Sequence, residues 1–139
     1  MNQPAPGFSN HPNYRVDIAP ADARLRILVG GQAIADTREA LLVTETRHRP
    51  VWYLPMADVD AGVIRATETS TYCPFKGHAS YWTVQVGDQV LEDVLWGYQD
   101  PYQECEPLRG YVSFYTDRVL LEIDGVSHSG PDSGPGRTR

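Results

Sequence analysis

Hydrophobic and polar residues alternate along this chain over short stretches that turn residues separate. Arg24 to Val29 alternates arginine with leucine and isoleucine, and Gly30-Gly31 divides it from Ala33 to Ala35. A period of two is typical of strands with one buried face. Two glycines can both take the positive φ of a type I′ turn. The pattern therefore predicts a hairpin at the start of the folded region.

Similar stretches follow toward the C-terminus, and no apolar spacing of three and four persists long enough for an amphipathic helix. The expected strands are Leu41 to Thr46, Val51 to Leu54, Thr67 to Tyr72, His78 to Val86, Val90 to Tyr98, Gly110 to Thr116 and Val119 to Ile123. The last two are expected to pair as a hairpin, and Asp58 or Asp60 could cap a short helical turn. Around eight or nine strands predict an all-β fold, with two antiparallel sheets in a small sandwich or open barrel.

Composition sets the expected domain limits. The 139 residues fit one domain. Residues 1–20 are rich in proline and residues 126–139 in serine, glycine and proline, so neither end can bury much apolar surface. We expect an N-terminal tail over 1–20, a single β domain over 21–125 and a C-terminal tail over 126–139.

Charge and cysteine content exclude several classes of protein. Twelve Lys and Arg against eighteen Asp and Glu give a net charge of −6 without a long basic run, which disfavours nucleic-acid binding and anionic membranes. No apolar run approaches the ~20 residues of a membrane span, and no signal-peptide pattern is present, so a cytoplasmic location is expected. Cys73 and Cys105 are too few for a disulfide framework or a four-cysteine zinc site. We expect no metal or cofactor, and either a monomer or a homodimer.

The segment Thr71 to Trp82, TYCPFKGHASYW, concentrates residues that carry chemistry. A proline fixes φ and a glycine permits an unusual one, so Cys73 to Gly77 is expected to be a rigid loop between two strands. Such a loop can present backbone N–H groups together with Lys76. This arrangement suits an anionic or carbonyl-bearing ligand.

Each reactive residue in this segment has a structural alternative. Cys73 is a buried thiol or a nucleophile, depending on its surroundings. Lys76 is either a solvated loop charge or the partner of Glu45, a charge within an apolar strand. Either His48 or His78 could act as a base beside Cys73. A metal site would need Cys73 and His78 with His48 and Cys105, whose spacings are not those of a zinc site.

Aromatic residues gather on the expected strands and their ends. In a small β protein such side chains are commonly core, but Trp and Tyr also need partners for their N–H and O–H groups. Several of them on one side of the loop would line a pocket with a polar floor. The candidate ligand-binding residues are Glu45, Tyr53, Asp58, Tyr72, Cys73, Lys76, Tyr81, Trp82 and Trp96.

Four runs carry a resemblance to a known family: GGQAIADTREALLVTET, VWYLPMADV, TYCPFKGHASYW and LWGYQDPYQECEPLRGYVSFY. They resemble the domain-of-unknown-function family DUF427, sometimes labelled nucleotidyltransferase-like, over Arg24 to Asp124. The resemblance implies a small all-β domain of two sheets in a tent-like arrangement. Relatives in that fold often hold zinc with two Cys-x-x-Cys pairs, which this sequence lacks. Several relatives hold a small ligand with aromatic side chains on one sheet, and by analogy Trp82 and Trp96 would do the same.

Two functions from different classes are compatible with these residues. The first is a binding module for a small polar or anionic molecule, in an aromatic-lined pocket beside Cys73 to Gly77. The second is an enzyme that uses the same pocket, with Cys73 as thiolate or Lys76 as electrostatic stabiliser. The nucleotidyltransferase label requires magnesium ligands, for which Asp58 and Asp60 have suitable spacing, but the chain has no P-loop.

Overall fold

The computed structural model describes residues 2–128, which form two antiparallel sheets. The seven-stranded sheet has the order β1-β4-β5-β9-β8-β7-β6, and the four-stranded sheet has the order β11-β10-β2-β3. The strands are β1 (Val16–Pro20), β2 (Leu25–Val29), β3 (Gln32–Thr37), β4 (Leu41–Glu45), β5 (Val51–Pro55), β6 (Ile64–Cys73), β7 (Gly77–Val86), β8 (Gln89–Gly97), β9 (Tyr111–Phe114), β10 (Leu120–Ile123) and β11 (Val126–His128). The expected all-β fold is confirmed, and the sheets do not close into a barrel.

Helical structure within residues 2–128 is limited to single short turns. These are α1 (Gly7–Asn10), η1 (Met56–Asp58), η2 (Ala61–Val63) and η3 (Gln103–Leu108). The carboxylate of Asp60 accepts a hydrogen bond from the backbone N–H of Gly62 at 2.9 Å, so Asp60 supplies the predicted cap. None of the helices in this part of the chain is long and apolar enough to span a membrane.

The predicted first hairpin is confirmed, whereas the predicted last one is wrong. Gly30 and Gly31 both have positive φ, 57° and 79°, and β2 pairs with β3 across them. In contrast, β9 pairs with β5 and β8, while β10 pairs with β2 and β11. Phe114 and Leu121 enter one core from opposite sheets, so the chain crosses between the sheets after β9. Alternation identifies strands but does not identify their partners.

The chain has regular structure beyond the expected limits of the β domain. Strand β1 lies within the stretch expected as an N-terminal tail and pairs with β4 from Val16↔Glu45 to Pro20↔Leu41. Strand β11 occupies the first residues of the expected C-terminal tail. The rest of that tail, 129–139, lies outside the described residues.

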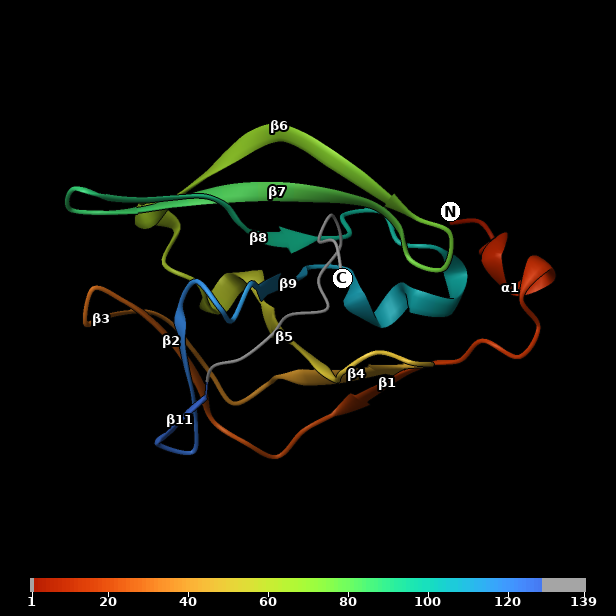
Figure 1. Cartoon of the computed structure of the whole chain (residues 1–139), viewed down its shortest axis with the longest axis horizontal. Helices are drawn as coiled ribbons and strands as arrows, with labels where there is room; N and C mark the ends of the chain where they lie inside the picture. Colours follow the sequence, from red (N-terminus) through yellow and green to blue (C-terminus); the bar gives the residue numbers. More distant parts are fainter. Residues whose placement is uncertain (1, 129–139) are drawn as a thin grey trace.

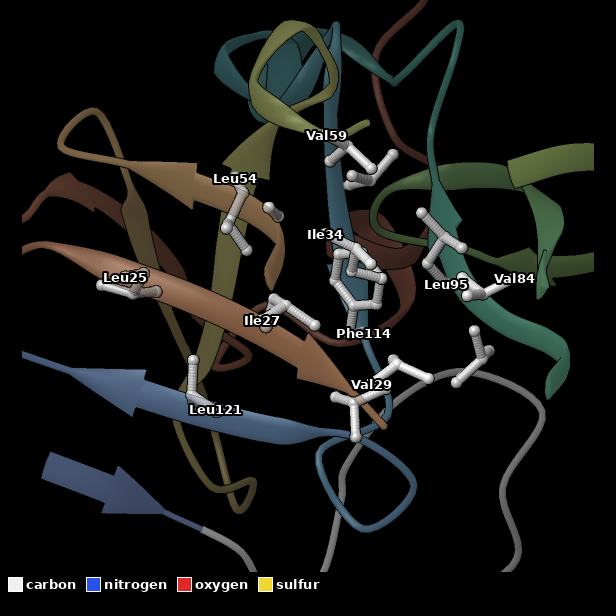
Figure 2. Close-up of a cluster of buried hydrophobic side chains, with 14 of the residues drawn as sticks. Leu25, Ile27, Val29, Ile34, Leu54, Val59, Val84, Leu95, Phe114 and Leu121 are labelled. Atoms are coloured by element: carbon white, nitrogen blue, oxygen red, sulfur yellow. The ribbon is translucent and has the colours of Figure 1, made fainter. Parts of the chain in front are cut away.

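The first hydrophobic core lies between the two sheets (Figure 2). The four-stranded sheet contributes Leu25, Ile27 and Leu121, and the seven-stranded sheet contributes Leu95 and Phe114. All are at most 3% exposed. Burial of these aliphatic and aromatic side chains holds the two sheets face to face.

The second core lies on the other face of the seven-stranded sheet. In Figure 1 the β6–β7 hairpin runs along the upper side and β1 and β4 along the lower side, with η3 between them. Adjacent residues therefore enter different cores: Tyr53 and Trp96 belong to the second, Leu54 and Leu95 to the first. Because strand side chains alternate between faces, burial of both faces makes each of these positions interior.

Truncation of Leu95 tests the first core. Leu95 is fully buried, so Leu95→Ala should lower the free energy of unfolding by about 2–5 kcal/mol through lost burial and the cavity left behind. Val90 on the same strand is 43% exposed, so Val90→Ala should change the free energy of unfolding by less than about 0.5 kcal/mol. Urea denaturation measures both, and equal effects would contradict this packing.

Candidate functional site

The loop between β6 and β7 is tight, as predicted. Cys73 is the last residue of β6 and pairs with Gly77, the first residue of β7, whose φ is 120°. An ideal Cβ on Gly77 would lie 3.3 Å from the backbone oxygen of Asp100. Glycine is therefore required both by the backbone angle and by the close approach of the chain before η3.

Phe75, at the tip of this loop, is held by the N-terminal segment. Its ring stacks on Tyr14 with centroids 3.9 Å apart and contacts Phe8 edge-on at 5.0 Å. The N–H of Gly7 donates to the carbonyl of Pro74 at 2.9 Å, and an ideal Cβ on Gly7 would overlap the Phe75 ring. The expected tail thus contributes part of the wall around the loop.

Lys76 is the only lysine in the sequence, and it is buried at 5% exposure. Its ammonium forms an ion pair with Oε1 of Glu45, the partner proposed from sequence. The other carboxylate oxygen of Glu45 accepts a hydrogen bond from the Tyr14 hydroxyl at 2.5 Å. A buried ammonium needs such a counter-charge because desolvation alone would be prohibitive. Burial and the Glu45 carboxylate raise the pKa of Tyr14, which keeps its hydroxyl a donor.

A group of polar aromatic side chains, which we call the tyrosine cluster, lies in the second core. It consists of Tyr53, Tyr81, Trp96, Tyr98, Tyr115 and Cys105. The Trp96 indole N–H donates to the Tyr53 hydroxyl at 3.3 Å. Burial raises the pKa of Tyr53 and of Tyr98, with Glu45 and Cys73 adding to the shift, so both phenols stay protonated. The second core therefore has a polar centre.

The two cysteines differ in environment. Cys105 is fully buried, its thiol donates to the carbonyl of Phe75 at 3.5 Å, and burial raises its pKa to about 12. Cys73 is half-buried, and its sulfur lies 3.9 Å from the Lys76 ammonium nitrogen. Cys73, Glu45 and Lys76 therefore form the charged edge of the tyrosine cluster.

Six of the nine candidate residues lie at this cluster or its edge, and three lie elsewhere. Tyr72 is 49% exposed and hydrogen-bonds to the Tyr102 hydroxyl at 2.7 Å. Asp58 accepts a hydrogen bond from Thr37 at 2.7 Å. Trp82 pairs with Leu95, whereas Tyr81 pairs with Trp96, so Trp82 lies on the opposite face of the sheet.

Trp82 instead lines a separate small pocket of about 100 Å³ with Met56, Gly97 and Tyr111. The ring passes over Gly97, where an ideal Cβ would lie 3.7 Å from it and 2.7 Å from the backbone oxygen of Tyr111. Trp82 and Trp96, the two residues that by analogy would hold a ligand, therefore lie on opposite faces of the sheet.

The candidate residues predicted from sequence did not include Tyr98, Tyr115 and Cys105 of the cluster, or Tyr14 at its edge. Tyr98 follows Trp96 by two residues, so alternation along the strand could have placed it on the same face. Cys105 was considered for a metal site and for a bridge to Cys73, but both cysteines are free, and within residues 2–128 no group of three metal-ligating side chains comes together. Tyr14 had no local signal because it lies among prolines in a stretch of low hydrophobicity.

Fold and site together define a small all-β domain with a polar, charge-edged centre in one of its two cores. The chain matches, over residues 17–125, the model of the domain of unknown function DUF427, labelled NTP_transf_9, and it belongs to this family. The resemblance drawn from sequence is confirmed. A comparison with curated proteins found no match.

The buried ion pair can be tested by neutralising each partner. Lys76→Met or Glu45→Gln alone should lower the free energy of unfolding by about 3–5 kcal/mol, because each leaves the other group buried without its partner. The double variant should recover part of that loss.

The exposed pair of Arg109 with Glu106, 2.7 Å apart, supplies the control. Arg109→Met should leave the urea midpoint almost unchanged, because exposed ion pairs contribute little. Single and double variants that lose stability additively would contradict direct coupling between Lys76 and Glu45.

Proposed function

We propose that this domain binds a small polar or anionic molecule at the tyrosine cluster, beside the Cys73 to Gly77 loop. The observation that carries the proposal is the burial of several phenol groups together in the second core, with the pKa of Tyr53 and of Tyr98 raised so that they stay protonated. The Tyr53 hydroxyl accepts a hydrogen bond from the Trp96 indole N–H at 3.3 Å, and Tyr53, Trp96 and Tyr98 are each at most 2% exposed. A protonated phenol donates as well as accepts hydrogen bonds, so this group of phenols suits a ligand that supplies acceptors.

The charges at the edge of the cluster support the same ligand chemistry. Lys76 and Glu45 neutralise one another, so the cluster presents neutral phenol donors rather than a net charge. A carbonyl or carboxylate oxygen on the ligand would accept hydrogen bonds from the phenols. The half-buried Cys73 and Glu45 mark the side from which such a molecule would approach.

A thermal-shift screen of small carboxylates and amides tests the binding function. A ligand at one hundred times its dissociation constant should add about 2.7 kcal/mol to stability. Tyr53→Phe or Tyr98→Phe keeps the ring but removes the donor, and should weaken binding by about fivefold to tenfold. Tyr111→Phe is the matched control, because that hydroxyl donates to the carbonyl of Glu39 at 3.1 Å, outside the cluster. Hits that respond equally in all three variants would contradict the proposal.

A second candidate, an enzyme with a Cys73 nucleophile, is favoured by one observation. The Lys76 ammonium lies 3.9 Å from the Cys73 sulfur, and a neighbouring cation stabilises a thiolate. His78 is exposed and its ring contacts Tyr72 at 4.8 Å, so it has a different partner. Lys76 is then the residue that would activate the thiol.

Iodoacetamide labelling at neutral pH tests this candidate. Cys73 should be alkylated and Cys105 should not, because the Cys105 thiol is buried and its pKa is raised to about 12. Mass spectrometry of peptides locates the label, and Cys73→Ser serves as the blank. Lys76→Met should slow alkylation severalfold. A Cys73 rate equal to that of free cysteine, and insensitive to Lys76→Met, would rule out an activated nucleophile.

A further inference from the structure

A second cavity, of about 250 Å³, lies on the other side of Tyr14, where the N-terminal segment meets the loop after β4. It is lined by Asn10, His11, Asn13, Tyr14, Thr46 and Arg47. Two hydrogen bonds fix this junction: the N–H of Arg15 donates to the side-chain oxygen Oγ1 of Thr46 at 2.8 Å, and the N–H of Thr46 donates to the carbonyl of Arg15 at 3.1 Å. We call it the Arg47 pocket.

The Arg47 pocket carries positive charge in a protein of net charge −6. Arg47 makes no ion pair or side-chain hydrogen bond within residues 2–128, although other arginines of the chain pair with carboxylates. The nearby carboxylates already have partners, since Asp17 pairs with Arg15 at 3.4 Å and Glu45 pairs with Lys76. The Arg47 guanidinium therefore remains available for an anion from outside the chain.

Two side-chain amides and an imidazole line the same pocket as this guanidinium. Within the described residues, the side chains of Asn10, His11 and Asn13 make no hydrogen bond, and all three are exposed to the pocket side of the segment. Arg47 has a positive φ of 63°, uncommon for a residue other than glycine, at the turn that brings it beside Tyr14. Several donors around one cation exceed what the two oxygens of a carboxylate can satisfy, and they match the three oxygens of a phosphate monoester.

We propose that the Arg47 pocket binds the phosphate group of a small phosphorylated molecule. The guanidinium of Arg47 would contact two phosphate oxygens in a bidentate manner, and the amides of Asn10 and Asn13 would donate to the remaining oxygen. A cavity of about 250 Å³ exceeds the volume of a phosphate group, so the pocket also has room for part of the attached molecule. This site is distinct from the tyrosine cluster, from which Tyr14 separates it.

Titration of the full chain with glycerol 3-phosphate tests the site, in about 50 mM and about 200 mM salt, a change that roughly halves the Debye length. The readout is the set of side-chain amide signals of Asn10 and Asn13 in a ¹⁵N-correlated NMR spectrum. We expect saturable shifts that weaken at the higher salt concentration, and no shifts with glycerol. Arg47→Gln should weaken binding about tenfold or more.

Arg65→Gln is the matched control, because Arg65 is an exposed arginine of β6 that contacts Gln85 instead. Wild-type affinity in Arg65→Gln together with loss in Arg47→Gln supports the proposal. Unchanged affinity in Arg47→Gln would overturn the proposal. Equal shifts with sulfate would also overturn it, because they indicate an adventitious ion only. Equal affinity for glycerate would overturn it as well, because it indicates a general carboxylate site. Tyr53→Phe should leave this titration unchanged. A failure of the phosphate-site proposal can therefore be distinguished from a failure of the binding function proposed for the tyrosine cluster.

Discussion

The burial of one ammonium group organises this molecule around the candidate site. Lys76 can leave water only because Glu45 neutralises it, and this contact joins the loop between β6 and β7 to the end of β4. These segments lie on opposite sides of the bent seven-stranded sheet (Figure 1). Tyr14 then binds the same carboxylate and stacks on Phe75, which brings the N-terminal segment to the same place. Loop, sheet and N-terminal segment thus share a single electrostatic contact.

Both faces of the central strands β5, β8 and β9 of the seven-stranded sheet are buried, and this arrangement explains what the sequence could predict. Alternating residues and glycine turns were enough to predict an all-β fold and most strands, because these signals are local. The pairing of the last strands was not predictable in this way, since Phe114 and Leu121 meet across the core from different sheets. Partner choice depends on which faces pack together, and local alternation carries no information on that.

The candidate site shows the same division between local and distant information. The charge of Glu45 in an apolar strand was a local anomaly that led to its pairing with Lys76. Tyr81 and Trp96 share a face through their register, while Trp82 is displaced by one position to the other face. The position of Tyr14 depends on contacts between residues about thirty or more positions apart, such as its hydrogen bond with Glu45. No periodicity in residues 1–20 could have indicated it.

The opposite orientations of Trp82 and Trp96 have a practical consequence for experiments on this protein. Trp96 is fully enclosed and donates to Tyr53, whereas Trp82 is only half-buried and lines a separate pocket. Their indoles therefore sense different polarity although they lie on neighbouring strands. With Trp52 replaced by phenylalanine, the two remaining indoles form a pair of intrinsic fluorophores, one for each side of the sheet, that separates events at the two faces without any attached dye.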